Sequence, residues 1–152
     1  MPGLVVLRPD DAGQTALLHA KCFADAWSAT SMRDLLKNPN VLTLGIQVEG
    51  ELVAFVMGQT VAGETDILTI ATDPDRRRQG LASQLIAALV KRMGERGVSR
   101  ITLDVAEDNL AARELYRAHG FVEDGRRPRY YRAAGGVSVD AILMSRSLAL
   151  AP

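Results

Sequence analysis

Residues 76–80, three arginines followed by glutamine and glycine, could bind an anion. They lie between a strand-like run that stops near Asp73-Pro74 and an amphipathic helical pattern that begins at Leu81. A helix N-terminus presents unpaired backbone N–H groups, and glycine lets a phosphate approach them closely. Arginines at the rim add bidentate donors. The segment predicts a pyrophosphate site without the glycine spacing of a P-loop or a dinucleotide fingerprint. The alternative is a solvated arginine turn before a helix.

A second segment, residues 109–121, could supply a proton donor. Asn109 is a typical helix N-cap, and Gly120 stands where such a helix would stop. Tyr116 lies within this helix and carries a phenolic proton. The alternatives are that Asn109 only caps the helix and that Tyr116 only packs on its inner face.

Four carboxylates on or beside predicted strands could act as general bases. Asp66 belongs to a β-rich run, and Asp104 belongs to an alternating strand over residues 100–105. Glu64 and Glu107 are further candidates. Each of the four could equally be a surface carboxylate of a strand.

The elements that must position these residues alternate along one chain. We expect strands at 4–8, on both sides of a hairpin at 49–51, and at 66–71, 100–105, 121–122 and 137–144. We expect helices at 11–23, 28–36, 81–97 and 109–119, and an arginine- and tyrosine-rich loop between the last two strands. The β-α-β unit around the third helix requires a parallel strand pair. The sheet should therefore be mixed, with helices on both faces.

Composition excludes several classes of protein. The 152 residues carry no net charge and are 47% hydrophobic, which indicates one globular domain over residues 1–152. Neutral charge argues against direct nucleic-acid binding. No apolar run reaches 18 residues and the N-terminus lacks a basic region, so we expect no membrane span, no signal peptide and a cytoplasmic protein.

Other marked residues receive weaker interpretations. Cys22 is the only cysteine, and we expect a small buried apolar side chain rather than a disulfide or an acyl carrier. His19 and His119 should lie on helix surfaces, and no cysteine–histidine cluster predicts a metal. Trp27 should be a packing anchor. Arginines also gather late in the chain, where no function is assigned to them: Arg126, Arg127, Arg129 and Arg132.

The two chemical segments together resemble the GNAT family of N-acetyltransferases. The run Arg-Arg-Gln-Gly-Leu-Ala matches the family's Q/R-x-x-G-x-G/A loop, and residues 109–121 match its N-x-x-A-x-x-L-Y-x-x-x-G-F signature. The resemblance covers nearly the whole chain. It implies an α/β (α+β) fold with a mixed, mostly antiparallel sheet of six to seven strands, helices on both faces, and a splay between strands 4 and 5. It also implies acetyl transfer from acetyl-CoA to an amine.

Three shorter matches are similar to bacterial ribosomal-protein-alanine N-acetyltransferases of the RimI type. They are Ala-Trp-Ser at 26–28, the strand at 66–74, and Arg-Pro-Arg-Tyr-Tyr at 127–131 followed by Asp-Ala-Ile-Leu-Met at 140–144. This resemblance implies the N-terminal α-amine of a ribosomal protein as acceptor. Because such an acceptor must reach the cleft, we expect a monomer, with a weak dimer through an edge strand as the alternative. The alternatives are acetylation of lysine side chains or of a small-molecule amine, or an acetyl-CoA-binding regulatory module with little turnover.

The resemblance also implies residue roles. Tyr116 matches the general acid that protonates the CoA sulfur. The RimI-type base is a glutamate twelve positions earlier, where this chain has Asp104, and Asp66 takes the place of an alternative base on the fourth strand. Tyr130 and Tyr131 would line the peptide-entry side or cover the sheet edge. The implied cofactor contacts are Ile70, Ala71, Thr72, Arg77, Arg78, Gln79, Gly80, Leu81, Ala82, Asn109 and Tyr116.

Overall fold

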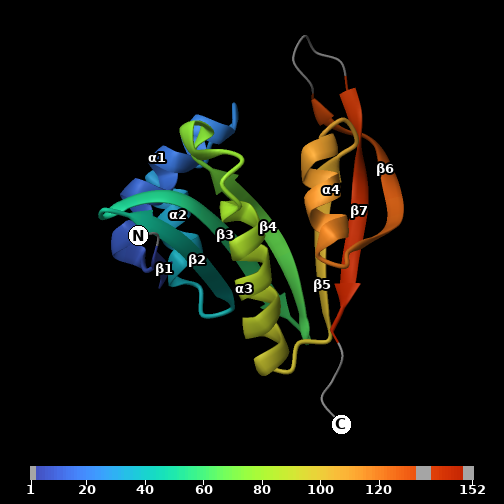
Figure 1. Cartoon of the computed structure of the whole chain (residues 1–152), viewed down its shortest axis with the longest axis horizontal. Coiled ribbons are helices and arrows are strands. Elements are labelled where there is room, and N and C mark those ends of the chain that lie inside the picture. Colours follow the sequence, from blue (N-terminus) through green and yellow to red (C-terminus); the bar gives the residue numbers. More distant parts are fainter. Residues whose placement is uncertain (1–2, 133–137, 149–152) are drawn as a thin grey trace.

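A seven-stranded sheet runs through the molecule in the order β1-β2-β3-β4-β5-β7-β6 (Figure 1). The computed structural model describes residues 3–132 and 138–148. The strands are β1 (Gly3–Val6), β2 (Val41–Val48), β3 (Glu51–Val61), β4 (Glu64–Thr72), β5 (Arg100–Ala106), β6 (Val122–Arg132) and β7 (Ser138–Ser147). The helices are α1 (Ala12–Cys22), α2 (Ala29–Lys37), α3 (Leu81–Glu95) and α4 (Leu110–Ala118), with short 3-10 turns at Pro9–Asp11 and Pro74–Arg76.

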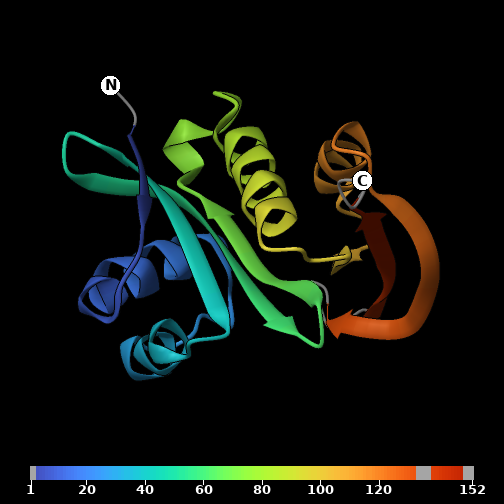
Figure 2. The same cartoon turned by 90° about the horizontal axis from the view of Figure 1, so that it is seen from below.

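Helices cover both faces of the sheet, as expected (Figure 2). On one face α1 and α2 pack on a core that includes Met32, Phe55 and Met57. On the other face α3 packs on a larger core that includes Leu85 and Leu89. Both cores draw on β3, because its side chains alternate between the two faces.

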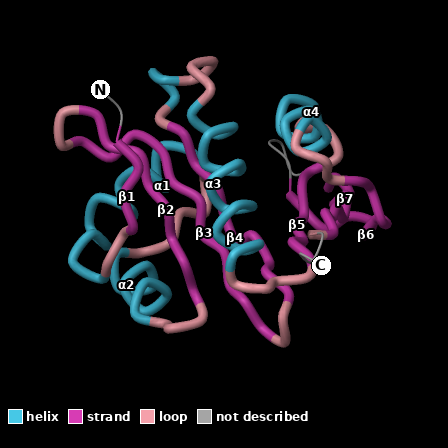
Figure 3. Tube along the Cα trace, turned by 60° about the horizontal axis from the view of Figure 1, so that its bottom comes forward, coloured by secondary structure: helices cyan, strands magenta, loops and turns pink. Residues whose placement is uncertain are grey.

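The sheet opens between β4 and β5. These strands pair in parallel over only a short stretch, in which residues 64–66 of β4 lie beside residues 100–102 of β5. A register shift between Met57 and Gly58 of β3 gives β4 an extra residue, and such bulges bend a strand. Figures 1 and 3 show the carboxyl-terminal parts of β4 and β5 diverging, with α3 on one side of the opening and α4 on the other. The predicted parallel pair and splay are confirmed.

One predicted loop is wrong. The arginine- and tyrosine-rich segment after Val122 is strand β6, which pairs antiparallel with β7 and forms an edge of the sheet. Pro128 lies in an irregularity of β6 between Arg127 and Tyr131, and edge strands tolerate proline at such a position. Tyr130 and Tyr131 therefore belong to a strand.

The ends of several elements also differ from expectation. The last strand continues beyond Met144 to Ser147, and its expected start at Val137 lies outside the described residues. At the first helix the Asp11 carboxylate accepts the backbone N–H of Arg8 at 2.7 Å instead of capping α1. Ser28 does cap α2, by accepting the N–H of Ser31.

Candidate functional site

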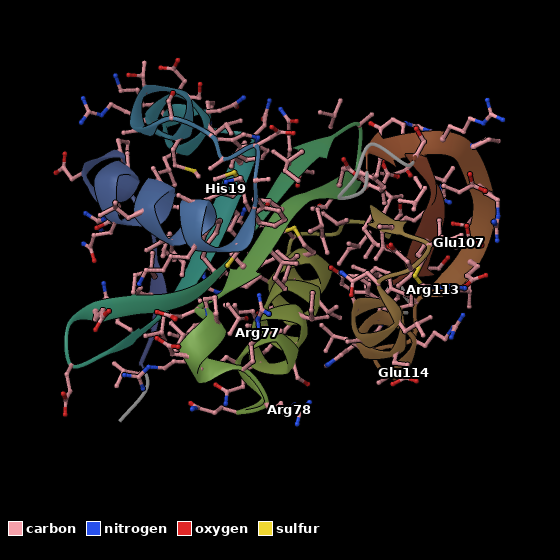
Figure 4. The ribbon with its side chains drawn as sticks, turned by 90° about the horizontal axis from the view of Figure 1, so that it is seen from above. His19, Arg77, Arg78, Glu107, Arg113 and Glu114 are labelled. Carbon is pink, nitrogen blue, oxygen red and sulfur yellow. The ribbon has the colours of Figure 1, made fainter. Side chains whose placement is uncertain are left out.

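The N-terminus of α3 is open to an anion. Gly80 is its N-cap with φ of 75°, a left-handed conformation that favours glycine, and it offers no side-chain cap. The N–H groups of the first helical turn therefore lack a capping side chain. A Cβ added at Gly80 would meet no atom within 4 Å. Arg77 and Arg78 precede it, and Figure 4 shows both on the loop that leads into α3.

Asp73 fixes the base of this loop. Its carboxylate is buried and accepts the backbone N–H of Asp75 at 3.0 Å and the ammonium of Lys21 at 3.3 Å. Both contacts lower the pKa of Asp73, and the hydrogen bond from the Asp75 backbone has the larger effect. Because Lys21 belongs to α1, the ion pair ties the anion loop to a helix on the opposite face of the sheet.

A cavity of about 540 Å³ leads from this loop into the opening of the sheet. Cys22 and Phe23 contribute to its wall from the α1 side. Gln79 is not among its lining residues. The other ten predicted cofactor contacts all line it: Ile70, Ala71, Thr72, Arg77, Arg78, Gly80, Leu81, Ala82, Asn109 and Tyr116.

A second cavity of about 530 Å³ lies on the far side of the opening. Its wall includes the segment after α1, the middle of β4, the end of β5, and Tyr131 and Val139 at the other edge. Five residues line both cavities: Phe23, Ile70, Asn109, Ala112 and Tyr116. The two cavities therefore meet at these residues. A ligand in one cavity that extends through the opening could be contacted by a second ligand in the other cavity.

Tyr116 lies at this junction in a buried position. Only 4% of the residue is exposed, and its ring packs against Phe121 with centroids 5.7 Å apart. Burial and the neighbouring Tyr131 raise the pKa of Tyr116 to about 12. Within the described residues its hydroxyl makes no hydrogen bond to another side chain. The phenol is therefore protonated at neutral pH and has its proton available.

The two predicted base residues lie on adjacent strands in different surroundings. Asp66 pairs in register with Thr102, whose hydroxyl donates to its carboxylate at 2.8 Å. Partial burial raises the pKa of Asp66; the hydrogen bond opposes this and the negative charge of Asp104 adds to it. Asp104 lines the second cavity, while Asp66 does not. The Arg127 guanidinium lies 4.0 Å from the Asp104 carboxylate.

The remaining carboxylate candidates are held in ion pairs and line neither cavity. Glu64 contacts Arg100 at 3.4 Å. Glu107 contacts Arg126 at 2.8 Å, on the β5–α4 side of the molecule (Figure 4). Asn109 accepts the N–H of Ala112 at 3.2 Å and so caps α4, while it also lines both cavities.

Three residues of the late arginine cluster, Arg126, Arg127 and Arg129, have partners that the sequence did not indicate. Arg126 also contacts Asp140 at 2.9 Å, and Asp140 accepts the backbone N–H of Arg129 at the same distance. Arg127 lies over the ring of Tyr130, 5.3 Å from its centroid. These contacts tie β6 to β7 and to the end of β5, so these three arginines stabilise the edge of the sheet beside the second cavity.

Two predictions for side chains near the site need revision. His19 is not on the surface: only 3% of it is exposed, and it lines the second cavity. Cys22 is half-buried, and its thiol donates to the carbonyl of Thr72 at 3.2 Å. Burial raises the pKa of Cys22, so its thiol stays protonated. The helix pattern alone could not predict the burial of His19, because a later segment of the chain, at Trp27, covers it.

Neither a metal-binding cluster nor a membrane-spanning helix occurs in the part of the chain that the structure describes. Residues 3–132 and 138–148 contain no group of three or more histidine, cysteine, aspartate or glutamate side chains placed to hold a metal ion. Among the helices described, none has the length and apolar character needed to cross a bilayer.

Comparison with known proteins gives consistent similarities. Residues 14–121 match the sequence profile of the Acetyltransferase (GNAT) family. The chain is 36% identical over 109 residues to the [ribosomal protein bS18]-alanine N-acetyltransferase of Escherichia coli strain K12, covering 72% of this chain and 73% of that protein. It is 34% identical over 142 residues to the N-alpha-acetyltransferase RimI of Mycobacterium tuberculosis, covering 90% and 86%.

A solved structure agrees with these sequence matches. The crystal structure of the ribosomal-protein-S18-alanine N-acetyltransferase from Escherichia coli superposes with a TM-score of 0.94 at 30% identity. The match covers 100% of this chain and 97% of that one.

Proposed function

The chain belongs to the GNAT family of acetyltransferases, and on that premise we propose that it acetylates the N-terminal α-amine of a ribosomal protein that begins with alanine. The meeting of two cavities at Tyr116 carries the proposal, because it gives a donor and an acceptor separate approaches to one point. The similarity to the Escherichia coli enzyme across the whole chain supports this choice of acceptor. Such an acceptor is made in the cytoplasm, where we expect the enzyme to act.

Acetyl-CoA is the expected acetyl donor, and the first cavity suits it. The uncapped N-terminus of α3 and the space above Gly80 fit a pyrophosphate. Arg77 and Arg78 would neutralise its charge. The end of β4, at Ile70, Ala71 and Thr72, would hold the pantetheine arm and offer backbone N–H groups to the thioester carbonyl. Gln79 lies outside the lining residues, so we expect it to contribute less.

Transfer requires the amine to lose a proton before its nitrogen attacks the thioester carbon. An α-amine has a reference pKa of about 7.7–8.0, against about 10.4 for lysine, so a carboxylate needs to give only modest help. We assign this role first to Asp104, on the cavity wall, and second to Asp66. Aspartate is one methylene shorter than glutamate, and a water molecule would bridge the added distance.

The bond between the carbonyl carbon and sulfur then breaks. Backbone N–H groups at the end of β4 would stabilise the oxyanion that precedes this step. The leaving thiolate takes a proton, which we assign to the Tyr116 hydroxyl. Its pKa of about 12 keeps the proton in place until the thiolate forms. The products are an N-acetylated chain and free CoA.

A panel of amines tests the proposal. The protein is incubated with acetyl-CoA and peptides that begin with alanine, peptides with a lysine and a blocked N-terminus, polyamines, or aminoglycosides, and released thiol is measured. We expect turnover to be fastest on the alanine peptides. Rapid turnover on polyamines or aminoglycosides, with none on any peptide, would contradict it. Tight acetyl-CoA binding without turnover on any amine would identify a regulatory module instead.

A further inference from the structure

A buried histidine forms part of one wall of the second cavity. His19 is in the last turns of α1, and its imidazole stacks on the ring of Phe23, with centroids 4.4 Å apart, and on the ring of Trp27, at 4.7 Å. The ring of Phe55, from β3, is tilted against it at 6.4 Å. Figure 4 shows His19 on the α1 side of the molecule, away from Arg77 and Arg78.

The histidine also makes a hydrogen bond that fixes its protonation state. Its Nδ1 accepts the backbone N–H of Trp27 at 3.2 Å. A nitrogen that accepts a hydrogen bond carries no proton, so the ring is neutral with its proton on Nε2. Burial lowers the pKa of His19, which agrees with a neutral ring at physiological pH.

The residues held by this histidine form the connection from α1 to α2. Four of them line the second cavity: Phe23, Ala24, Asp25 and Trp27. The stack and the hydrogen bond join the end of α1 to Trp27, eight residues after His19. Without the acceptor at Nδ1, the N–H of Trp27 would lose its partner, and the two aromatic rings would keep only their stacking contacts.

We propose that His19 is a positioning residue for the acceptor: by stacking on Phe23 and Trp27 and accepting the Trp27 N–H, it shapes the wall of the acceptor cavity. Of the residues that it holds, Phe23 also lines the cofactor cavity, whereas Trp27 lines only the acceptor cavity. The proposal rests on the second cavity being the acceptor site. His19 itself does not line the first cavity. A substitution that keeps a ring against Phe23 but removes the acceptor for Trp27 should therefore weaken acceptor binding and leave acetyl-CoA binding nearly unchanged.

The kinetic test uses His19→Phe, which keeps an aromatic ring and removes the hydrogen-bond acceptor. We expect the KM for the acceptor to rise about tenfold at pH 8, as for a partly buried N–H group that loses its partner. The KM for acetyl-CoA and kcat should change less than about twofold, within the scatter of a substitution that removes no direct contact. His19→Leu, which also lacks the acceptor, should behave alike and replaces His19→Phe if that variant does not fold. An equal rise in both KM values would overturn the proposal.

The pH profile supplies a readout that simple loss of packing would not give. Protonated His19 cannot accept from Trp27. Because burial lowers the pKa of His19 below its ordinary value of about 6.5, the advantage of the wild type over His19→Phe should persist at pH 6.5 and shrink only at lower pH. The other titratable groups around this cavity are Asp25, Asp104, Asp108, Tyr116 and Tyr131. They are present in both proteins, so their titration largely cancels in the ratio of acceptor KM values. A ratio that already falls between pH 8 and pH 7 would contradict a buried histidine that is neutral and accepts the Trp27 N–H at physiological pH.

A third measurement needs no acceptor and separates this inference from the proposed function. Trp27 is the only tryptophan, so its fluorescence reports on this segment alone. We expect acrylamide to quench it more strongly in His19→Phe than in the wild type at pH 8. His119→Gln, which changes the other histidine, is the matched control and should quench like the wild type. Equal quenching in His19→Phe and the wild type would overturn the proposal even if the acceptor were already known.

Discussion

At the scale of the residue, burial gives Tyr116 its chemical character. A phenol at the junction of two cavities, with a pKa of about 12, is a proton donor rather than a base at neutral pH. Tyr131 lines the acceptor side and has a similar pKa, raised first by burial and then by Asp104. Of the two tyrosines, only Tyr116 also lines the cavity assigned to acetyl-CoA.

Removing the Tyr116 hydroxyl tests this assignment. Tyr116→Phe keeps the ring that packs on Phe121, so we expect a stable protein. Its kcat should fall about 10²- to 10⁴-fold, the usual contribution of a positioned acid. The measurement is steady-state thiol release with a saturating acceptor, and the matched control is Tyr131→Phe. An unchanged kcat in Tyr116→Phe would show that the proton comes from another group.

The two aspartates can be separated in the same assay. Asp104→Asn should lower kcat/KM about 10²-fold or more, because its carboxylate lines the acceptor cavity. Asp66→Asn should have a smaller effect, because that carboxylate already accepts a hydrogen bond from Thr102. If Asp66→Asn caused the larger loss, the order of the two bases would have to be reversed.

At the scale of the element, the start of α3 depends on one glycine for two reasons. The φ of 75° at Gly80 strains any other residue, and the space above it would hold a phosphate. Gly94 lies near the other end of the same helix, where an added Cβ also meets nothing within 4 Å and φ is not positive. The two glycines form a matched pair.

Substitution of the pair should give opposite results. Gly80→Ala should lower the free energy of unfolding by about 1 kcal/mol and raise the KM for acetyl-CoA. Gly94→Ala should raise the free energy of unfolding by up to about 1 kcal/mol and leave that KM unchanged. Urea unfolding and initial rates measure the two effects. If Gly80→Ala left the KM for acetyl-CoA unaffected, the pyrophosphate would not bind at this loop.

The elements also show how far sequence patterns reach. The glycine-started helix, the Asn109 cap and the parallel β4–β5 pair follow from local signals and from the right-handed crossover, and they were predictable. Strand β6 was not, because Pro128 and a run of charged residues hide its pairing with β7. The burial of His19 was not predictable either, because it depends on a contact with Trp27 after the helix has ended.

At the scale of the whole molecule, two halves meet through a short parallel ladder. Strands β1 to β4 form one half and β5, β7 and β6 the other, and β4 and β5 pair over three residues. The first cavity takes its walls from both halves. A ligand that fills it would therefore hold the halves together, and its binding free energy would add to the stability of the native state.

Thermal unfolding measures this linkage. At 100 times its dissociation constant, acetyl-CoA should add about 2.7 kcal/mol and raise Tm by roughly 5–10 °C for a chain of this size. Gly80→Ala should show a smaller shift at the same ligand concentration. An equal shift with acetyl phosphate, which lacks the nucleotide, would indicate that the cavity does not bind the CoA moiety.

The position of the acetyl group on a doubly reactive peptide tests the central claim most directly. The peptide begins with a free alanine and contains one internal lysine, and the product formed with acetyl-CoA is sequenced by tandem mass spectrometry. We predict acetylation of the alanine α-amine and an unmodified lysine. Acetylation of the lysine with a free N-terminus would contradict the proposed N-terminal activity.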